Sequence, residues 1–235
     1  MRRRDFFTST AAFGLLAASR GALAATQEAP RPTAGSVRPL KAPENEMIRV
    51  AFAISKGTTE IDYVGPEAVF ETWYQDPVTK KPAPRFKLFT VSDTRDAVDG
   101  RVADFTFDTV PSPHIVVVPA QRGSVALTDW LCKVSPTADV TMSVCVGARH
   151  LAAAGLLNGK KATSHHDAID RLVKDFPDVQ WVRGVRFVEG EKISTGGGLT
   201  AGIDLALHVV ERYFGRGEAL KVAEHLEYEG KGWMV

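Results

Sequence analysis

The sequence predicts a doubly wound α/β domain, in which helices cover both faces of a mainly parallel sheet. Short apolar segments rich in branched residues alternate with longer segments of helical periodicity, which is typical of βαβ units. The apolar segments are nearly continuous, as expected of strands that are buried on both faces. The expected folded part, 47–235, has about 189 residues, which is enough for one well-buried domain.

The expected strands lie, in chain order, at 47–54, 85–91, 114–120 and 139–145, with a short strand at 102–107 and a hairpin at 185–195. Helical patterns lie at 63–74, 124–133, 146–157, 168–176, 199–214 and 217–228. Doubly wound sheets bind ligands beyond the carboxyl ends of their strands, where the turns into the helices converge. Reactive side chains are therefore expected directly after strands.

Residues 1–24 are expected to form a signal peptide for bacterial export. Arg3 and Arg4 match the twin-arginine pattern, and the apolar segment 11–18 that follows is too short to span a bilayer. The small residues at 22–24, Ala-Leu-Ala, suit a signal peptidase. We expect a periplasmic or otherwise exported protein without stable membrane insertion after cleavage. A disordered basic arm or an uncleaved anchor is the alternative.

The net charge of the expected mature chain does not favour binding to a polyanion. Cleavage after residue 24 would remove four arginines and one aspartate, leaving 25 basic against 27 acidic residues and a net charge of −2. A nearly neutral chain has no basic field to attract nucleic acid. The segment 25–46 holds four prolines and few large apolar residues, so it is expected to be a flexible linker.

The chain has two cysteines, and the sequence predicts different roles for them. Cys132 lies in an amphipathic segment and is expected to be a buried packing thiol, with a disulfide as the alternative. Cys145 ends an apolar strand and begins a helix that carries Gly147. This arrangement predicts a nucleophile elbow, which projects a reactive side chain above the sheet. The amino end of a helix, with Arg149 nearby, is expected to lower the pKa of this thiol.

Three ordered segments carry a family resemblance. The Cys145 segment, together with "EIDYVGPEAVFE" before it and "ISTGGGLTAGIDLALHVVER" after it, resembles the ThiJ/PfpI family of the class I glutamine amidotransferase-like superfamily. Its isonitrile hydratase and AraC-associated branch is the most similar. The resemblance implies a flavodoxin-like three-layer α/β/α sandwich. It also implies a dimer of identical subunits.

The resemblance further implies that an acidic residue from the first strand-to-helix connection faces the cysteine. Asp62 stands at the matching position. Two anions cannot persist in contact in a poorly solvated pocket, so carboxyl and thiol would share a proton. Asp62 is thus expected to donate a proton during catalysis, with capping of its own helix as the alternative. Glu60 is a competing acid without the motif match.

Backbone N–H groups are expected to stabilise charge that develops on a substrate. Val146 would supply one donor, and the turn at Ala120 and Gln121 a second. The family commonly has glycines at this turn. Directly after the cysteine, protease-like members have histidine and isonitrile hydratases have threonine, whereas this chain has Val146. A local peptidase triad is therefore not expected.

Other polar and glycine residues complete the expected pocket. His165 matches a family histidine and is expected to line the pocket or transfer a proton. His166 would face the opposite side on an extended chain, so metal chelation is not expected. Gly196 and Gly197 are expected to form a tight turn beside the cysteine, because the glycine spacing fits a dinucleotide loop poorly. No cofactor is expected.

Several side chains other than Cys145 and Asp62 are expected to have supporting roles. Asp204 is expected to anchor its helix, and His150 to lie at a surface or interface. Aromatic residues near the end of the chain, such as Trp233, are expected either to cover a partner subunit or to pack within the chain.

Two functions from different classes remain open. The first is an enzyme in which Cys145 attacks a small electrophilic carbon and Asp62 manages the proton. By resemblance, the reaction would be hydration of an isonitrile to an N-formamide. The second is a periplasmic domain that binds a small ligand or senses oxidants through Cys145 without turnover. Both functions require a small-molecule ligand, and neither requires nucleic acid.

Overall fold

A seven-stranded sheet forms the centre of the computed structural model, which describes residues 39–72, 74–75, 82–96 and 99–234. The sheet order is β10-β11-β7-β6-β1-β4-β5, and every neighbouring pair is parallel except β10 with β11. Its strands are β1 (Ile48–Ala53), β4 (Phe86–Ser92), β5 (Phe105–Thr106), β6 (Ile115–Val118), β7 (Val140–Ser143), β10 (Phe187–Val188) and β11 (Ile193–Gly196). The predicted mainly parallel sheet is confirmed.

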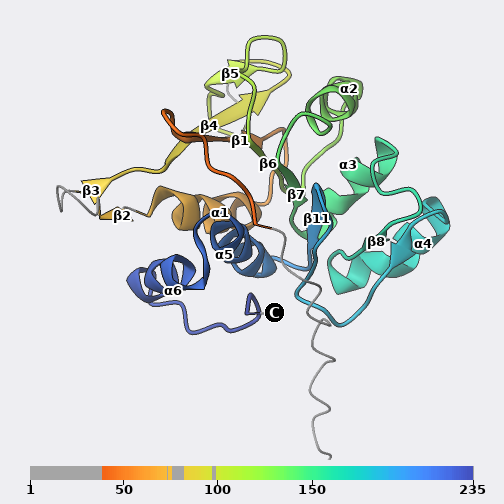
Figure 1. Cartoon of the computed structure of the whole chain (residues 1–235). Helices are drawn as coiled ribbons and strands as arrows, with labels where there is room; N and C mark the ends of the chain where they lie inside the picture. The colour runs from red at the N-terminus through yellow and green to blue at the C-terminus, as the bar shows by residue number, and fades with distance from the viewer. Residues whose placement is uncertain (1–38, 73, 76–81, 97–98, 235) are drawn as a thin grey trace, which may run out of the picture.

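Helices cover both faces of this sheet, as Figure 1 shows. Helices α1 (Glu60–Glu71), α5 (Ala201–Phe214) and α6 (Arg216–His225) lie on one side, and α2 (Val125–Val134) and α3 (Ala148–Ala153) on the other. Helix α4 (Ile169–Asp175) contacts the short strand β9 (Gln180–Trp181). The three-layer α/β/α sandwich is therefore confirmed.

The central strands divide the hydrophobic core into two layers. Val50 and Phe52 of β1 pack in the layer beneath α1, α5 and α6, whereas Ala51 and Ala53 pack in the layer beneath α2 and α3. Successive side chains of a strand point to opposite faces, so each strand contributes to both layers. All four residues are buried, which explains why the apolar runs are continuous.

Two small sheets lie outside the central one. Strands β2 (Tyr74–Gln75) and β3 (Pro82–Ala83) form an antiparallel pair, and β8 (Lys161–Ala162) pairs in parallel with β9 (Gln180–Trp181). Each of these strands has two residues, which is too short for a periodic pattern. The pair β8 and β9 connects the chain between α3 and α4 to the chain that enters β10.

The ends of the described chain pack onto the domain. Leu40 lies within the predicted linker, but its N–H donates to the carbonyl of Arg212 at 2.8 Å and its side chain packs on the core. Near the other end, Trp233 is fully buried within the chain, so this aromatic residue does not cover a partner. The predicted homodimer stays a prediction.

The predicted signal peptide 1–24 and the linker up to residue 38 lie outside the described residues. Among the described segments, every helix is too short or too polar to cross a membrane.

Candidate active site

Cys145 lies directly beyond the carboxyl end of β7, where it begins the short helix η1 (Cys145–Gly147) that leads into α3. Its backbone φ of +58° is in the left-handed region, which non-glycine residues rarely adopt. Such a conformation costs on the order of 1–3 kcal/mol. The Cys145 N–H donates to the carbonyl of Gly197 at 2.7 Å, which helps to hold the strained residue in place. The strand-to-helix turn therefore has the geometry of a nucleophile elbow.

Gly147 is required for this turn. A Cβ atom at this position would lie 2.1 Å from the carbonyl oxygen of Val118 at the end of β6. Backbone cannot move aside as a flexible side chain can, so a larger residue would separate η1 from β6. The expected close approach at Gly147 is present.

Asp62 lies in the first turn of α1 and is completely buried. The helix begins at Glu60 with Thr59 as its N-cap, so Asp62 is not the capping residue. Its Oδ2 instead accepts the backbone N–H of Ala120 at 3.1 Å. Its Oδ1 has no N–H or O–H donor among the described residues. The competing acid, Glu60, is exposed and pairs with Arg101 at 3.3 Å.

The carboxyl group of Asp62 and the thiol of Cys145 are close enough for each to shift the pKa of the other. Burial raises the pKa of Asp62 to about 6, against the Ala120 N–H, the thiol and the charge of His165, which all lower it. Burial and the negative charge of Asp62 raise the pKa of Cys145. The pair therefore loses its first proton readily and strongly resists losing its second.

The sequence predicted a lowered pKa for the Cys145 thiol. This prediction was wrong, because the pKa is raised. The helix beyond the elbow is short, with six residues in α3, so its dipole is small. Arg149 is exposed and is not among the groups that shift the Cys145 pKa. Burial and the facing carboxylate outweigh these contributions.

Two backbone N–H groups face the sulfur and favour its ionised form. They belong to Val146, as expected for an elbow, and to Leu199, which the sequence did not predict. Leu199 follows the three glycines and has a φ of +48°, and this strained backbone places its N–H at the thiol. The only sequence signal for it was the glycine-rich turn itself, in which a leucine would not be expected to adopt a positive φ.

The turn after β6 binds the carboxyl group of Asp62 through a backbone N–H. The N–H of Ala120 is engaged by Asp62, and the Ala120 carbonyl accepts the N–H of Thr59 at 2.8 Å. The side-chain amide of Gln121 donates to the carbonyl of Ala53 at 2.9 Å. Neither the Ala120 amide nor the Gln121 Nε2 is therefore free to stabilise a substrate oxyanion in this arrangement.

His165 lies beside the pocket, but not as predicted. The chain at this point is not extended, because His166 begins the short helix η2 (His166–Ala168). The two imidazole rings stack with centroids 4.4 Å apart and an angle of 28° between their planes. The expectation that the two rings face opposite sides was wrong. Pocket lining by His165 is supported by its electrostatic effect on Asp62.

The glycine turn after β11 and the helix α5 that follows it have the roles that the sequence predicts. Gly196 ends β11, and Gly197 accepts the Cys145 N–H, so both line the elbow. Asp204 is buried and binds the Arg186 Nε at 2.5 Å and the Tyr228 hydroxyl at 3.2 Å. Asp204 is thus an anchor for α5.

Two further assignments were wrong. His150 is buried on the inner side of α3, where its Nε2 lies 3.1 Å from the carbonyl oxygen of Gln121. Cys132 is exposed rather than packed, and both cysteines are free thiols. The buried side of α2 consists of Leu127, Trp130, Leu131 and Val134, and position 132 falls outside this stripe.

Access to the sulfur is narrow. Cys145 is only 7 % exposed, so a reacting molecule must present a slender group. Leu199, whose N–H faces the sulfur, is 41 % exposed and apolar. A small electrophile with an adjacent apolar part matches these surroundings.

The comparisons with known proteins agree with this geometry. The family model described as the DJ-1/PfpI family matches residues 48–212. Isonitrile hydratase of Pseudomonas putida is 36 % identical over 136 residues, which are 52 % of this chain and 55 % of that protein. The HTH-type transcriptional regulator CdhR of Pseudomonas aeruginosa is 33 % identical over 106 residues, which are 45 % of this chain and 31 % of the regulator.

The chain thus spans about half, or less, of the length of these curated relatives. A crystal structure of a ThiJ/PfpI family protein from Pseudomonas syringae superposes with a TM-score of 0.67 at 27 % identity, covering 79 % of this chain and 77 % of that one. The family match includes Asp62, the elbow at Cys145 and the strands of the central sheet. The chain belongs to the DJ-1/PfpI family.

Proposed function

We propose that this protein is a cysteine-dependent enzyme that hydrates a small isonitrile to an N-formamide. The observation that carries the proposal is the completely buried carboxyl group of Asp62 beside the thiol of Cys145. A buried carboxylate that forms no ion pair among the described residues is energetically costly, and its pKa of about 6 suits proton transfer at neutral pH. The similarity to an isonitrile hydratase supports the choice of substrate.

The proposed reaction begins from a neutral thiol and an ionised Asp62, because the pKa of Cys145 is raised. As the sulfur bonds to the terminal isonitrile carbon, Asp62 takes the thiol proton and delivers it to the same carbon. This gives a thioimidate, R–N=CH–S–enzyme. Water then adds to that carbon, the C–S bond breaks and the sulfur is protonated again. The net change is R–NC plus water to R–NH–CHO.

The backbone around the sulfur supports this sequence of steps. The N–H groups of Val146 and Leu199 stabilise negative charge on the sulfur while its proton is on Asp62. The narrow access fits the linear isonitrile group. Valine at position 146 offers no hydroxyl to the attacking water, so the second step would depend on Asp62 as its base.

Turnover of p-nitrophenyl isocyanide tests the proposal. Wild-type protein should form the N-formamide, and Cys145→Ala should reduce kcat/KM by at least about 10³-fold, as expected when a nucleophile is removed. Cys132→Ser is the matched control, because it removes the exposed thiol and should retain the wild-type rate. Equal rates for wild type and Cys145→Ala would refute the proposal.

A second candidate function is redox sensing or ligand binding without turnover. The similarity to a transcriptional regulator favours it. Intact-mass measurement after mild peroxide distinguishes the two. A stable two-oxygen adduct on Cys145, in a protein that does not turn over isocyanide, would favour sensing.

A further inference from the structure

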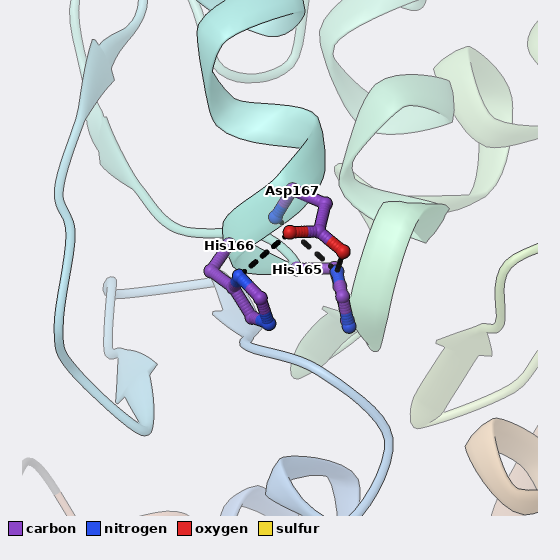
Figure 2. Close-up of side chains that lie close together, drawn as sticks. All are labelled: His165, His166 and Asp167. Atoms are coloured by element: carbon purple, nitrogen blue, oxygen red, sulfur yellow. Dashed lines mark hydrogen bonds and ion pairs between the residues drawn. The ribbon is translucent and has the colours of Figure 1, made fainter.

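Three consecutive side chains at the amino end of α4 gather their donor atoms in one place. They belong to His165, His166 and Asp167, and Figure 2 shows the Asp167 carboxylate beside the two imidazole rings. One nitrogen of each histidine and one carboxylate oxygen all lie within 4.8 Å of one another. We propose that these three residues bind a divalent transition-metal ion, with Zn²⁺ as the reference ion.

The distances within the cluster are short. The Nδ1 of His166 lies 2.8 Å from the Asp167 Oδ1, and the Nδ1 of His165 lies 3.8 Å from the Asp167 Oδ2. Metal–ligand bonds of about 2.0–2.2 Å place neighbouring ligand atoms roughly 3–3.6 Å apart. The cluster therefore needs a movement of about 1 Å to close around an ion.

The fold holds one ligand and leaves the other two free to make that movement. The ring of His165 packs against Gly198, where a Cβ would lie 2.5 Å from its Cδ2 atom. Its Nδ1 accepts the Asp167 N–H at 3.3 Å, which is a long and weak hydrogen bond. The side chains of His166 and Asp167 are 81 % and 77 % exposed. An exposed side chain can rotate at little cost, so these two residues can adjust to the ion.

The local backbone produces this convergence. On an extended chain, two adjacent histidines would point to opposite sides. The turn of η2 instead stacks the rings with centroids 4.4 Å apart. His165 precedes the helical turn and His166 begins it, so both rings and the carboxylate lie on the same side (Figure 2).

The donor set defines the class of ion. Two imidazole nitrogens and one carboxylate oxygen suit Zn²⁺, Ni²⁺, Co²⁺ and Cu²⁺, whereas Mg²⁺ and Ca²⁺ prefer oxygen ligands. Three protein ligands leave at least one coordination position open. The cluster lies beside the glycine turn that borders the elbow, because the ring of His165 contacts Gly198. The proposed metal site does not rest on the proposed isonitrile hydration.

Calorimetric titration of the full chain, without a histidine tag, with ZnCl₂ tests the proposal. Wild-type protein should bind one Zn²⁺ at this cluster. His166→Ala and Asp167→Asn should each weaken binding at least tenfold, since residues that merely orient a ligand already account for about 10–100-fold. Both residues are exposed, so the variants should fold, and circular dichroism checks this.

Two control variants separate the cluster from other metal-binding groups. His225→Ala removes an exposed histidine beside an acidic residue at the end of α6, and Cys132→Ser removes the exposed thiol. Both should bind Zn²⁺ as wild type does. MgCl₂ should give no binding.

The outcomes are decisive in either direction. Absence of Zn²⁺ binding by wild type would overturn the proposal. So would unchanged affinity in both His166→Ala and Asp167→Asn, or loss of binding in Cys132→Ser with retention in His166→Ala. Cobalt substitution gives an independent readout, since nitrogen and oxygen ligands produce visible bands without the thiolate charge-transfer absorption of a cysteine site.

Discussion

Two buried aspartates, Asp62 and Asp204, occupy equivalent places in the fold and serve opposite purposes. Each lies in the first turn of a helix on the same side of the sheet, and each is essentially inaccessible to solvent. Asp204 binds Arg186 at 2.5 Å and Tyr228 at 3.2 Å. Asp62 has one backbone N–H and a thiol.

The difference shows what distinguishes a structural carboxylate from a reactive one. Burial raises the pKa of Asp204 as well, but the Arg186 guanidinium and the Tyr228 hydroxyl oppose this rise and hold its carboxylate in place on α5. At Asp62 the opposing groups are one backbone N–H, the thiol and the charge of His165, and burial raises its pKa to about 6. Asp62 can therefore exchange a proton near neutral pH, at a cost in stability.

The largest expected effect is on turnover by Asp62→Asn. The amide keeps the size of the carboxyl group but cannot take the thiol proton. The rate with p-nitrophenyl isocyanide should fall about 10²–10⁴-fold, which is the usual contribution of a general acid–base residue. Steady-state kinetics at pH 7.5 measure this fall. A decrease of less than tenfold would show that Asp62 does not transfer the proton.

The substitution Asp204→Asn is expected to have a smaller effect, which is on the stability of the folded protein. Removing one partner of a fully buried ion pair costs 3–5 kcal/mol, but Arg186 is 42 % exposed, so water can replace part of the lost interaction. We expect the free energy of unfolding to fall by about 2 kcal/mol, as measured by urea denaturation. Activity per folded molecule should stay close to that of wild type. An unchanged denaturation midpoint would contradict the anchoring role.

The smallest effect is a gain in stability from Asp62→Asn at neutral pH. The pKa of Asp62 is higher in the folded protein than its ordinary value of 3.8, so wild type loses stability as pH rises from about 4 to about 6. The variant does not titrate here. It should be more stable by about 1–3 kcal/mol at pH 7.5, and this gain should vanish near pH 4. A gain that does not depend on pH would have another cause.

The fold was predictable because its signals are local and repeated. Continuous segments of branched residues predicted the buried strands, and the residues around Cys145 and Gly147 predicted the elbow. The pairing of Asp62 with Cys145 came from the family resemblance, because residues 83 positions apart in the chain carry no local signal of contact. Cys132 was predicted to be buried, although the stripe of buried residues on its helix does not include position 132.

The details that the sequence did not predict depend on individual backbone conformations. The N–H of Leu199 reaches the sulfur because a leucine adopts a positive φ, which propensity argues against. His165 and His166 stack because a helical turn begins between them. The raised pKa of Cys145 results from burial and from the charge of Asp62, which is far away in the sequence. Tertiary packing, which no local pattern encodes, determines all three.

The most direct test of the Asp62–Cys145 pair is the pH dependence of Cys145 alkylation by iodoacetamide. The measurement compares Cys132→Ser with the double variant Cys132→Ser/Asp62→Asn, so that only Cys145 reacts. The negative charge of Asp62 raises the pKa of Cys145, so its removal should shift the alkylation profile to lower pH and speed the reaction at pH 7.5. Superimposable profiles, or a shift to higher pH, would contradict the coupling of the two groups.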